Sequence, residues 1–585
     1  MLLLAAIISY SALDSYRWHG NSWKETVRSD GSGYYAYLPA VFIYQDLEYN
    51  FYRDLKDKYA FGDLSANFLI HSEGRKFNRY YCGTAIAMTP FFLSAMAASS
   101  VIGFDVDGHS ILFNYALNIG AIFYAFLGLY FLYRFLIRHF SKWIVAIACG
   151  AIFLGTNLFY YTVYESSYSH SFSFSFICFF IYLADVSIRT KTRKSFVLLA
   201  AIAGMVFLIR PSNAIVLLSL PFIAGSKEAF IGWLKSAFKI SIFVPTVVVG
   251  LAVASIQFWL NYLQCGSFIV DGYPTETFYF TRPELVNMWF SYRAGVLVWS
   301  PVVILSLVGL IALFQKNKFL LLSFLGFMFI NSWIISSWWA WHYSGTFGMR
   351  PMVDYMAFFV ILLCYALSLS NSISWRILSL TTLLALTFIG HTMNIQKIRE
   401  IVHYDKMTKE KFWYIFMHNH QKYSYLLSEP YRPPSPKPYD KIRVKHFSFK
   451  APKGFDNFPE GYSNFNSANE IEYSGTGDAV LARIDPGNMQ GTEKYYFELQ
   501  AKTYYLSLND EAKLIVQFKS GDQVLHTSEF LPLQPDFRTK HWNIIQFSLV
   551  AEESMKEADE IVLSIRNKDK QIFFQQLEIT LANFK

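Results

Sequence analysis

The sequence carries little charge for its length and few cysteines. Only 16% of its 585 residues are Asp, Glu, Lys or Arg, whereas 53% are hydrophobic and 19% are aromatic. Soluble domains carry about a quarter charged residues, so this composition excludes an ordinary soluble protein. The five cysteines form no Cys-x-x-Cys pair and no Cys/His spacing typical of a metal site. Cys82 and Cys265 are both expected outside the membrane and are the candidates for a disulfide.

The chain also lacks a basic run of the kind that binds nucleic acid, and its net charge is only +8. Lys and Arg gather in short segments between apolar runs, such as Arg189–Lys194, which is the pattern that orients membrane helices. The apolar start, Met1–Leu13, has no basic n-region and no small-residue cleavage site, so we expect no cleavable signal peptide. The sequence therefore predicts a polytopic membrane protein without a nucleic-acid partner.

Long apolar runs predict about eleven transmembrane helices. With basic loops inside, the N-terminus is cytoplasmic and the C-terminal portion lies outside. The predicted spans are residues 1–18, 111–133, 143–163, 171–188, 195–209, 214–224, 240–263, 295–314, 319–338, 355–369 and 376–394.

The apolar run Gly83–Val101 is long enough to cross a membrane, but the neighbouring charges argue against a crossing. If it crossed, the acidic loop Phe104–Asp107 would be cytoplasmic and the basic residues after 111–133 would lie outside. Both placements contradict the positive-inside rule. We therefore predict that this run forms a membrane-surface or re-entrant helix.

Beyond residue 395 the composition changes. Residues 396–440 read as a connecting segment that contains a Pro-rich linker. From 441 to 585, short alternating stretches bounded by turn residues predict strands, for example 495–501, 513–518 and 560–565. We predict a transmembrane domain over 1–395 and a water-soluble β-sandwich over 441–585. A carbohydrate-binding jelly roll and a purely structural cap are both consistent with this sandwich.

The main candidate for chemistry is Ser29–Pro39, just after the first apolar segment. It places Asp30 before a Gly-Ser-Gly turn and a Tyr-rich run. A carboxylate at a membrane surface can activate a hydroxyl beside a lipid substrate. Asp is also common at the start of a helix, so a capping role is the second interpretation, and the two are compatible.

Further polar residues gather on the same predicted outer side. Arg210 ends an apolar run before Pro211, where a charge faces either a cavity or the lipid headgroups. His170 also suits a packing role, Arg350 and Asp354 also suit an i,i+4 salt bridge, and Trp338–Trp341 suits an interfacial belt or a sugar-stacking surface. The outer set is Asp30, Lys76, Asn78, Arg79, Glu165, His170, Arg210, His342, Arg350 and Asp354.

Taken in order, these segments resemble the GT-C integral-membrane glycosyltransferases. The likeness is greatest to the protein-mannosyltransferase and lipid A aminoarabinose-transferase branch, and it covers residues 1–395. The segments that carry it are Asp30–Ala36, Lys76–Tyr80, Thr89–Leu93, Tyr168–Phe172, Leu208–Asn213, Trp338–Trp341 and Phe347–Arg350.

This resemblance implies transfer of a sugar from a polyprenyl-phosphate carrier to a glycan, lipid or protein acceptor. The expected place is the periplasmic face of a bacterial inner membrane, in the cell envelope. Asp30 would be the general base of one inverting displacement. Arg79, Arg210 and Arg350 would bind the donor phosphate. Substrate would be oriented by Glu165, His170 and Asn78.

The chain departs from the family pattern at Asn78 and His170, where some relatives carry acids. We therefore expect no metal and no cofactor beyond the lipid-linked sugar. Two readings from other classes remain open. A lipid-linked saccharide transporter or flippase would show an internal repeat and charges in mid-membrane. A non-catalytic scaffold would bind glycan through the C-terminal domain.

Overall fold

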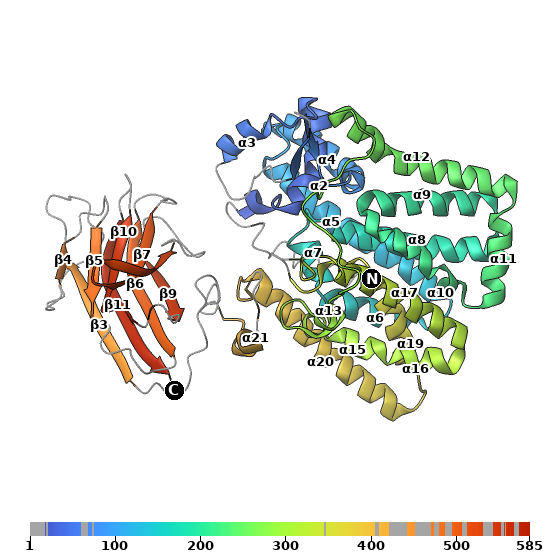
Figure 1. The fold of residues 1–585 in the computed structure, drawn as a ribbon. Helices are drawn as coiled ribbons and strands as arrows, with labels where there is room; N and C mark the ends of the chain where they lie inside the picture. Colours follow the sequence, from blue (N-terminus) through green and yellow to red (C-terminus); the bar gives the residue numbers. More distant parts are fainter. Residues whose placement is uncertain are drawn as a thin grey trace. The chain divides into compact units, whose positions relative to one another are not determined.

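The computed structural model divides the chain into two compact units, one with the helices up to Ile398 and one with the C-terminal strands (Figure 1). The described residues are 18, 22–59, 68–72, 75–343, 347–403, 407, 409–420, 441–450, 470–472, 479–485, 494–505, 512–530, 542–550, 555, 557–566 and 572–584.

Six helices in the described part of the chain are long and apolar enough to cross a membrane, so the chain is an integral membrane protein. These are α4 (Gly83–Ile102), α5 (Ile111–Leu136), α8 (His170–Thr190), α12 (Ile240–Cys265), α17 (Lys318–Ser336) and α20 (Ile373–Ile398). Shorter helices follow the same predicted runs: α6 (Lys142–Gly155), α7 (Leu158–Val163), α9 (Arg193–Ile209), η4 (Pro211–Ser219), α10 (Leu220–Ala224), α14 (Val296–Trp299), α15 (Val302–Leu307), α16 (Gly309–Lys316) and α19 (Met356–Leu367). Further helices after residue 225 are α11 (Lys227–Ala237), α13 (Leu285–Phe290), α18 (Arg350–Val353) and α21 (Lys409–Ile415).

The predicted count of eleven spans is not confirmed. The predicted spans 143–163 and 295–314 are each broken into shorter helices. The first break falls at Thr156, whose backbone is extended, and the second falls beside Pro301, which has no N–H to continue a helix. Residues 1–17 of the first predicted span lie outside the described residues.

The predicted surface helix is one continuous helix, α4, that packs against α2 (Asp30–Pro39), α5 and α9. Its length and composition also suit a membrane span. Its position at the membrane surface therefore stays a prediction.

The helix α9 lies between α8 and α12 (Figure 1). It ends at Ile209 because Pro211 disfavours the helical conformation for the residue before it. Arg210 accordingly has an extended backbone, with φ −152° and ψ 112°. This local break carries the Arg210 side chain away from the helix axis.

The polar stretch after the first predicted span folds into a small unit of its own. It contains η2 (Ser22–Glu25), α2, the π-helical turn η3 (Ala40–Tyr44), α3 (Tyr52–Tyr59) and the antiparallel pair β1 (Leu69–Ser72) and β2 (Arg75–Asn78). A buried cluster joins α2, η3, α3 and the start of β1, with Ala36, Tyr49, Phe51 and Phe68 among its members. This cluster seats α2 at a defined place beside the helices.

The C-terminal strands form two sheets around one hydrophobic core, as the predicted β-sandwich requires. The strand orders are β5-β10-β7-β8 and β4-β3-β11-β6-β9. The strands are β3 (Lys441–Lys450), β4 (Glu470–Glu472), β5 (Ala479–Ile484), β6 (Lys494–Tyr505), β7 (Lys513–Ser520), β8 (Gln523–Phe530), β9 (Trp542–Val550), β10 (Glu560–Arg566) and β11 (Ile572–Phe584). The three strands quoted from the sequence are confirmed as β6, β7 and β10.

The predicted disulfide between Cys82 and Cys265 is wrong, because both cysteines are free. Cys82 is buried at the start of α4, where its backbone N–H donates to the Gln257 Oε1 atom at 2.7 Å. Cys265 ends α12, and its thiol donates to the Asn261 carbonyl of the preceding helical turn.

Gly83 packs closely against the end of α9 and so helps to position Arg210. A substitution at Gly83 tests this packing. A Cβ atom there would lie 2.4 Å from the Ile209 backbone nitrogen and 2.6 Å from the Leu208 carbonyl oxygen. We expect Gly83→Ala to lower the free energy of unfolding by about 1–3 kcal/mol, because the backbone cannot rotate away as a side chain can. Thermal unfolding in detergent measures this loss.

The matched control is Gly150→Ala in α6, where a Cβ atom meets nothing within 4 Å. Alanine favours the helix there by about 0.5–1 kcal/mol. Equal melting temperatures for both variants would contradict the packing described for Gly83.

Candidate active site

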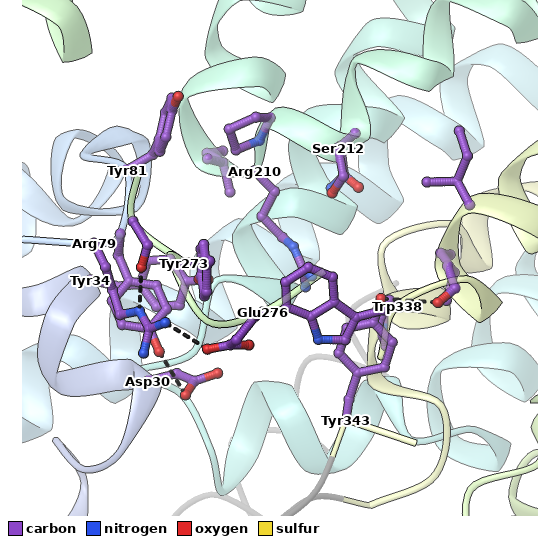
Figure 2. Close-up of a pocket in the computed structure, with 18 of the residues that line it drawn as sticks. Asp30, Tyr34, Arg79, Tyr81, Arg210, Ser212, Tyr273, Glu276, Trp338 and Tyr343 are labelled. Atoms are coloured by element: carbon purple, nitrogen blue, oxygen red, sulfur yellow. Dashed lines mark hydrogen bonds and ion pairs between the residues drawn. The ribbon is translucent and has the colours of Figure 1, made fainter. Parts of the chain in front are cut away.

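A cavity of about 870 Å³ opens among α2, β2, α9, η4, α12, α17 and α18. Its lining includes charged side chains and also apolar side chains from η4 and α17, such as Ile215 and Ile334. Figure 2 shows Asp30, Tyr34 and Arg79 on one side, Trp338 and Tyr343 on the other, and Arg210 reaching between them. Six of the seven predicted site residues line this cavity: Asp30, Asn78, Arg79, His170, Arg210 and Arg350.

Asp30 is the first residue of α2, and its carboxylate faces the cavity. Its Oδ1 atom accepts a hydrogen bond from the Tyr80 hydroxyl at 2.8 Å. Its Oδ2 atom lies 2.7 Å from Nη1 of Arg350. The capping role is wrong, since the helix has no side-chain cap and the carboxylate has these two partners instead.

Two opposing effects act on the Asp30 carboxyl. Burial by itself would raise its pKa, but the Arg350 charge and the hydrogen bonds from Tyr80 and Arg350 together hold the pKa below its usual value. The carboxylate is therefore ionised at neutral pH. Burial raises the pKa of the Tyr80 hydroxyl, and the negative charge of Asp30 raises it further. The hydroxyl therefore stays protonated and donates its hydrogen bond to Asp30.

A second charged group lies deeper, around the fully buried carboxylate of Asp354. Its Oδ1 atom is 2.7 Å from Nδ1 of His170, and its Oδ2 atom is 2.6 Å from the Asn213 amide nitrogen and 3.7 Å from Nε of Arg210. Arg210 also places Nη1 3.0 Å from the His170 ring nitrogen. Because Asp354 pairs here and Arg350 pairs with Asp30, the alternative i,i+4 salt bridge between them is wrong.

Arg79 follows β2 and is held by the loop 266–284. Its Nη2 atom lies 2.7 Å from Oε1 of Glu276, and its Nε atom donates to the Gly272 carbonyl at 3.1 Å. The guanidinium carbon also lies 4.2 Å from the centre of the Tyr273 ring. Figure 2 shows Glu276 reaching across the cavity toward Arg79.

Two predicted substrate-orienting residues have other partners. Asn78 is buried and donates from its amide to the Gly33 carbonyl at 2.7 Å, which ties α2 to β2. Glu165 does not line the cavity: its carboxylate pairs with Arg28 and accepts from the Tyr160 hydroxyl. This ion pair turns the carboxylate toward the segment before α2, and the substrate contact of Glu165 stays a prediction.

Four residues at the site were missed or left without a role by the sequence reasoning: Tyr80, Tyr273, Glu276 and Asp354. Tyr80 is the last residue of Lys76–Tyr80, one of the segments that carry the family resemblance. Its position beside Asp30 could therefore have been predicted from the sequence. Asp354 was noted on the outer side but not assigned to a site. Glu276 and Tyr273 lie in a polar loop with no motif, and only the fold brings them to Arg79.

Among the described residues, no group of three or more His, Cys, Asp or Glu side chains comes together as a metal site. The independence from metal stays an expectation. What the cavity offers chemically is an ionised carboxylate that can accept a proton and three guanidinium groups that can bind an anion. Each of these guanidinium groups already lies beside a carboxylate.

No protein-family model and no curated protein matches the chain. Among solved structures it is similar to the arabinosyltransferase EmbB from Mycobacterium smegmatis, with 9% sequence identity and a TM-score of 0.30. The similarity covers 86% of this chain and 60% of that one, so the chain spans less than two thirds of the length of EmbB. Similarity this low carries no argument about activity, which has to be inferred from the cavity itself. The fold and the cavity define an integral membrane protein with a charged, ion-paired cavity.

Asp354 tests the deeper charged group. Replacing it with Asn leaves Arg210 without its counter-charge in a buried place, so we expect Asp354→Asn to lower the free energy of unfolding by about 1–3 kcal/mol. Thermal unfolding in detergent measures the change. The control is Asp54→Asn on the exposed face of α3, expected to change stability by less than about 0.5 kcal/mol. Equal effects would show that the network does not stabilise the helical unit.

Proposed function

We propose that the chain is a membrane glycosyltransferase that moves a sugar from a polyprenyl-phosphate donor to an acceptor on the extracytoplasmic face. The observation that carries the proposal is the ionised Asp30 carboxylate on the wall of a cavity that also contains three guanidinium groups. A base and an anion-binding set in one cavity are what a displacement with a phosphate leaving group needs.

In the proposed step, the acceptor hydroxyl gives its proton to Asp30 while its oxygen attacks the anomeric carbon. The bond from that carbon to the phosphate oxygen breaks, and polyprenyl phosphate leaves with the electron pair. Asp30 is a weak base, held by Arg350 and Tyr80, which suits a transition state in which the leaving bond breaks early and the proton moves late. One such displacement inverts the anomeric centre.

The leaving phosphate carries negative charge that cations must stabilise. Arg79 and Arg210 are the proposed contacts, because guanidinium forks match phosphate oxygens. Arg350 is already committed to Asp30 at 2.7 Å, so we assign it to positioning the base. His170, fixed by Asp354 and Arg210, is placed to orient the sugar or the acceptor.

The lipid part of the donor needs an apolar surface next to the charged one. Ile215 of η4 and Ile334 and Ile335 of α17 provide it on the cavity wall. Leu217 and Leu218 of η4 continue this surface outward, with 46% and 45% of their areas exposed. We propose that the polyprenyl chain leaves the cavity between these two helices, with the acceptor being a glycan, a lipid or a protein. The proposed location is a bacterial inner membrane with the cavity on the periplasmic side.

The test follows release of free polyprenyl phosphate by the full chain in lipid, supplied with polyprenyl-phosphate sugars and a cell-envelope extract. We expect Asp30→Asn to lower the release rate at least about 100-fold, because the amide cannot accept the proton. The control is Asp46→Asn, which removes a carboxylate that does not line the cavity; Asp46 accepts from the backbone N–H groups of Glu48 and Asn50 through its two oxygens, and the amide keeps one of these acceptors.

Equal release by wild type and Asp30→Asn would move the base to another residue. Absence of release with every donor would contradict the transferase and favour the transporter or the scaffold reading.

The pH profile tests the role of Arg350. Because the Arg350 charge helps to hold the pKa of Asp30 below its usual value, wild-type kcat/KM should lose activity only at a pH below the usual titration range of an Asp carboxyl. In Arg350→Gln the effect of burial remains while the lowering charge is gone, so the acid limb should move to higher pH. The control Arg282→Gln removes an exposed charge from loop 266–284 and should leave the limb in place. An unmoved limb in Arg350→Gln would contradict the role assigned to it.

A further inference from the structure

We propose that Glu276 occupies the phosphate site on Arg79, and that a phosphate-bearing lipid binds by displacing this carboxylate. The inference rests on the proposed function, which supplies the phosphate-bearing lipid. It makes Glu276 a residue that sets which anions the cavity accepts.

The first observation is that the Arg79 side chain makes all of its three contacts with one short segment of the chain. Arg79 receives the Glu276 carboxylate at 2.7 Å, the Gly272 carbonyl at 3.1 Å and the Tyr273 ring at 4.2 Å from the guanidinium carbon. These three residues belong to a single segment of loop 266–284. A guanidinium that turns toward another anion therefore releases all three loop contacts together.

The second observation concerns the neighbouring ion pairs, which are harder to exchange. Asp354 is fully buried and has three partners. Asp30 is the first residue of helix α2, which fixes its backbone. In the third pair, the Arg79 and Glu276 side chains keep 18% and 20% of their areas exposed, close to the 15% and 25% of the Arg350–Asp30 pair, but Glu276 comes from a loop and not from the start of a helix. It is the pair that a ligand entering the cavity can reach and open.

The third observation is that the Glu276 carboxylate has a second hydrogen-bond donor, which it can keep after the exchange. Its Oε2 atom accepts a hydrogen bond from the Trp339 indole nitrogen at 3.0 Å. Trp339 is half exposed and belongs to the segment after α17. The displaced carboxylate keeps this bond and is not left without a donor. A carboxylate and a phosphate present similar oxygen atoms to a guanidinium fork, and the phosphate carries the more negative charge when fully ionised.

Binding of farnesyl phosphate to the full chain in lipid nanodiscs tests this exchange by calorimetry. Removing the competing charge in Glu276→Gln should tighten binding about 3- to 10-fold, and Arg79→Gln should weaken it by a similar or larger factor. The matched control is Glu284→Gln, which removes one exposed acid from the same loop without touching Arg79 and should bind as wild type does. Farnesol, which lacks the phosphate, should bind equally to all four proteins.

A second measurement uses the wild-type chain alone and does not depend on a variant folding well. Hydrogen exchange of the amides at 272–276 should become faster when farnesyl phosphate is bound, because Arg79 no longer holds this segment. Farnesol should leave the exchange rates unchanged.

Binding by Glu276→Gln that is no tighter than wild type, with unchanged exchange at 272–276, would overturn the inference. The transferase proposal would still stand in that case, because the release assay with Asp30→Asn decides it separately. If wild type and Glu276→Gln both fail to bind farnesyl phosphate, the inference is overturned together with the phosphate-linked donor.

Discussion

The ion pair between Asp30 and Arg350 joins residues 320 positions apart in the chain and sets the geometry of the cavity. It links the start of α2, in the region after the first predicted span, to the start of α18, which follows the segment after α17. Burial alone would push the Asp30 carboxyl toward its neutral form, and the Arg350 charge reverses that tendency. The carboxylate stays ionised because the fold supplies this partner.

The rest of the cavity follows the same rule, that a charge near the membrane needs a partner. Arg210 and His170 share the buried Asp354, and Arg79 takes Glu276. The helix break before Pro211 and the contact of Gly83 with the end of α9 place Arg210 where this pairing is possible. In the proposed transferase these pairs serve two roles: one fixes the base, and another gives way to the donor phosphate.

Local sequence patterns predicted the strands and many of the helices, because each such pattern is set by residues that lie close together in the chain. The alternation at 513–518 is β7, and the apolar run 111–133 lies within α5. The breaks near Thr156 and Pro301 were missed because the composition stays apolar across them. At the site, Asp30, Arg79, Arg210 and Arg350 were expected on one side, and all four line the cavity. Most of their ion pairs were not predictable, since pairing depends on contacts between distant segments: Glu276, the partner of Arg79, has no motif around it, and Asp354 pairs with Arg210 and not with Arg350.

The most direct test of this account is the anomeric configuration of the product. A donor with a known configuration is transferred by the full chain in lipid, and the new glycosidic bond is examined by NMR. A single displacement, with Asp30 taking the acceptor proton, predicts a product inverted at the anomeric carbon. A product that retains the donor configuration would require a covalent intermediate or a second displacement. It would contradict the role proposed for Asp30.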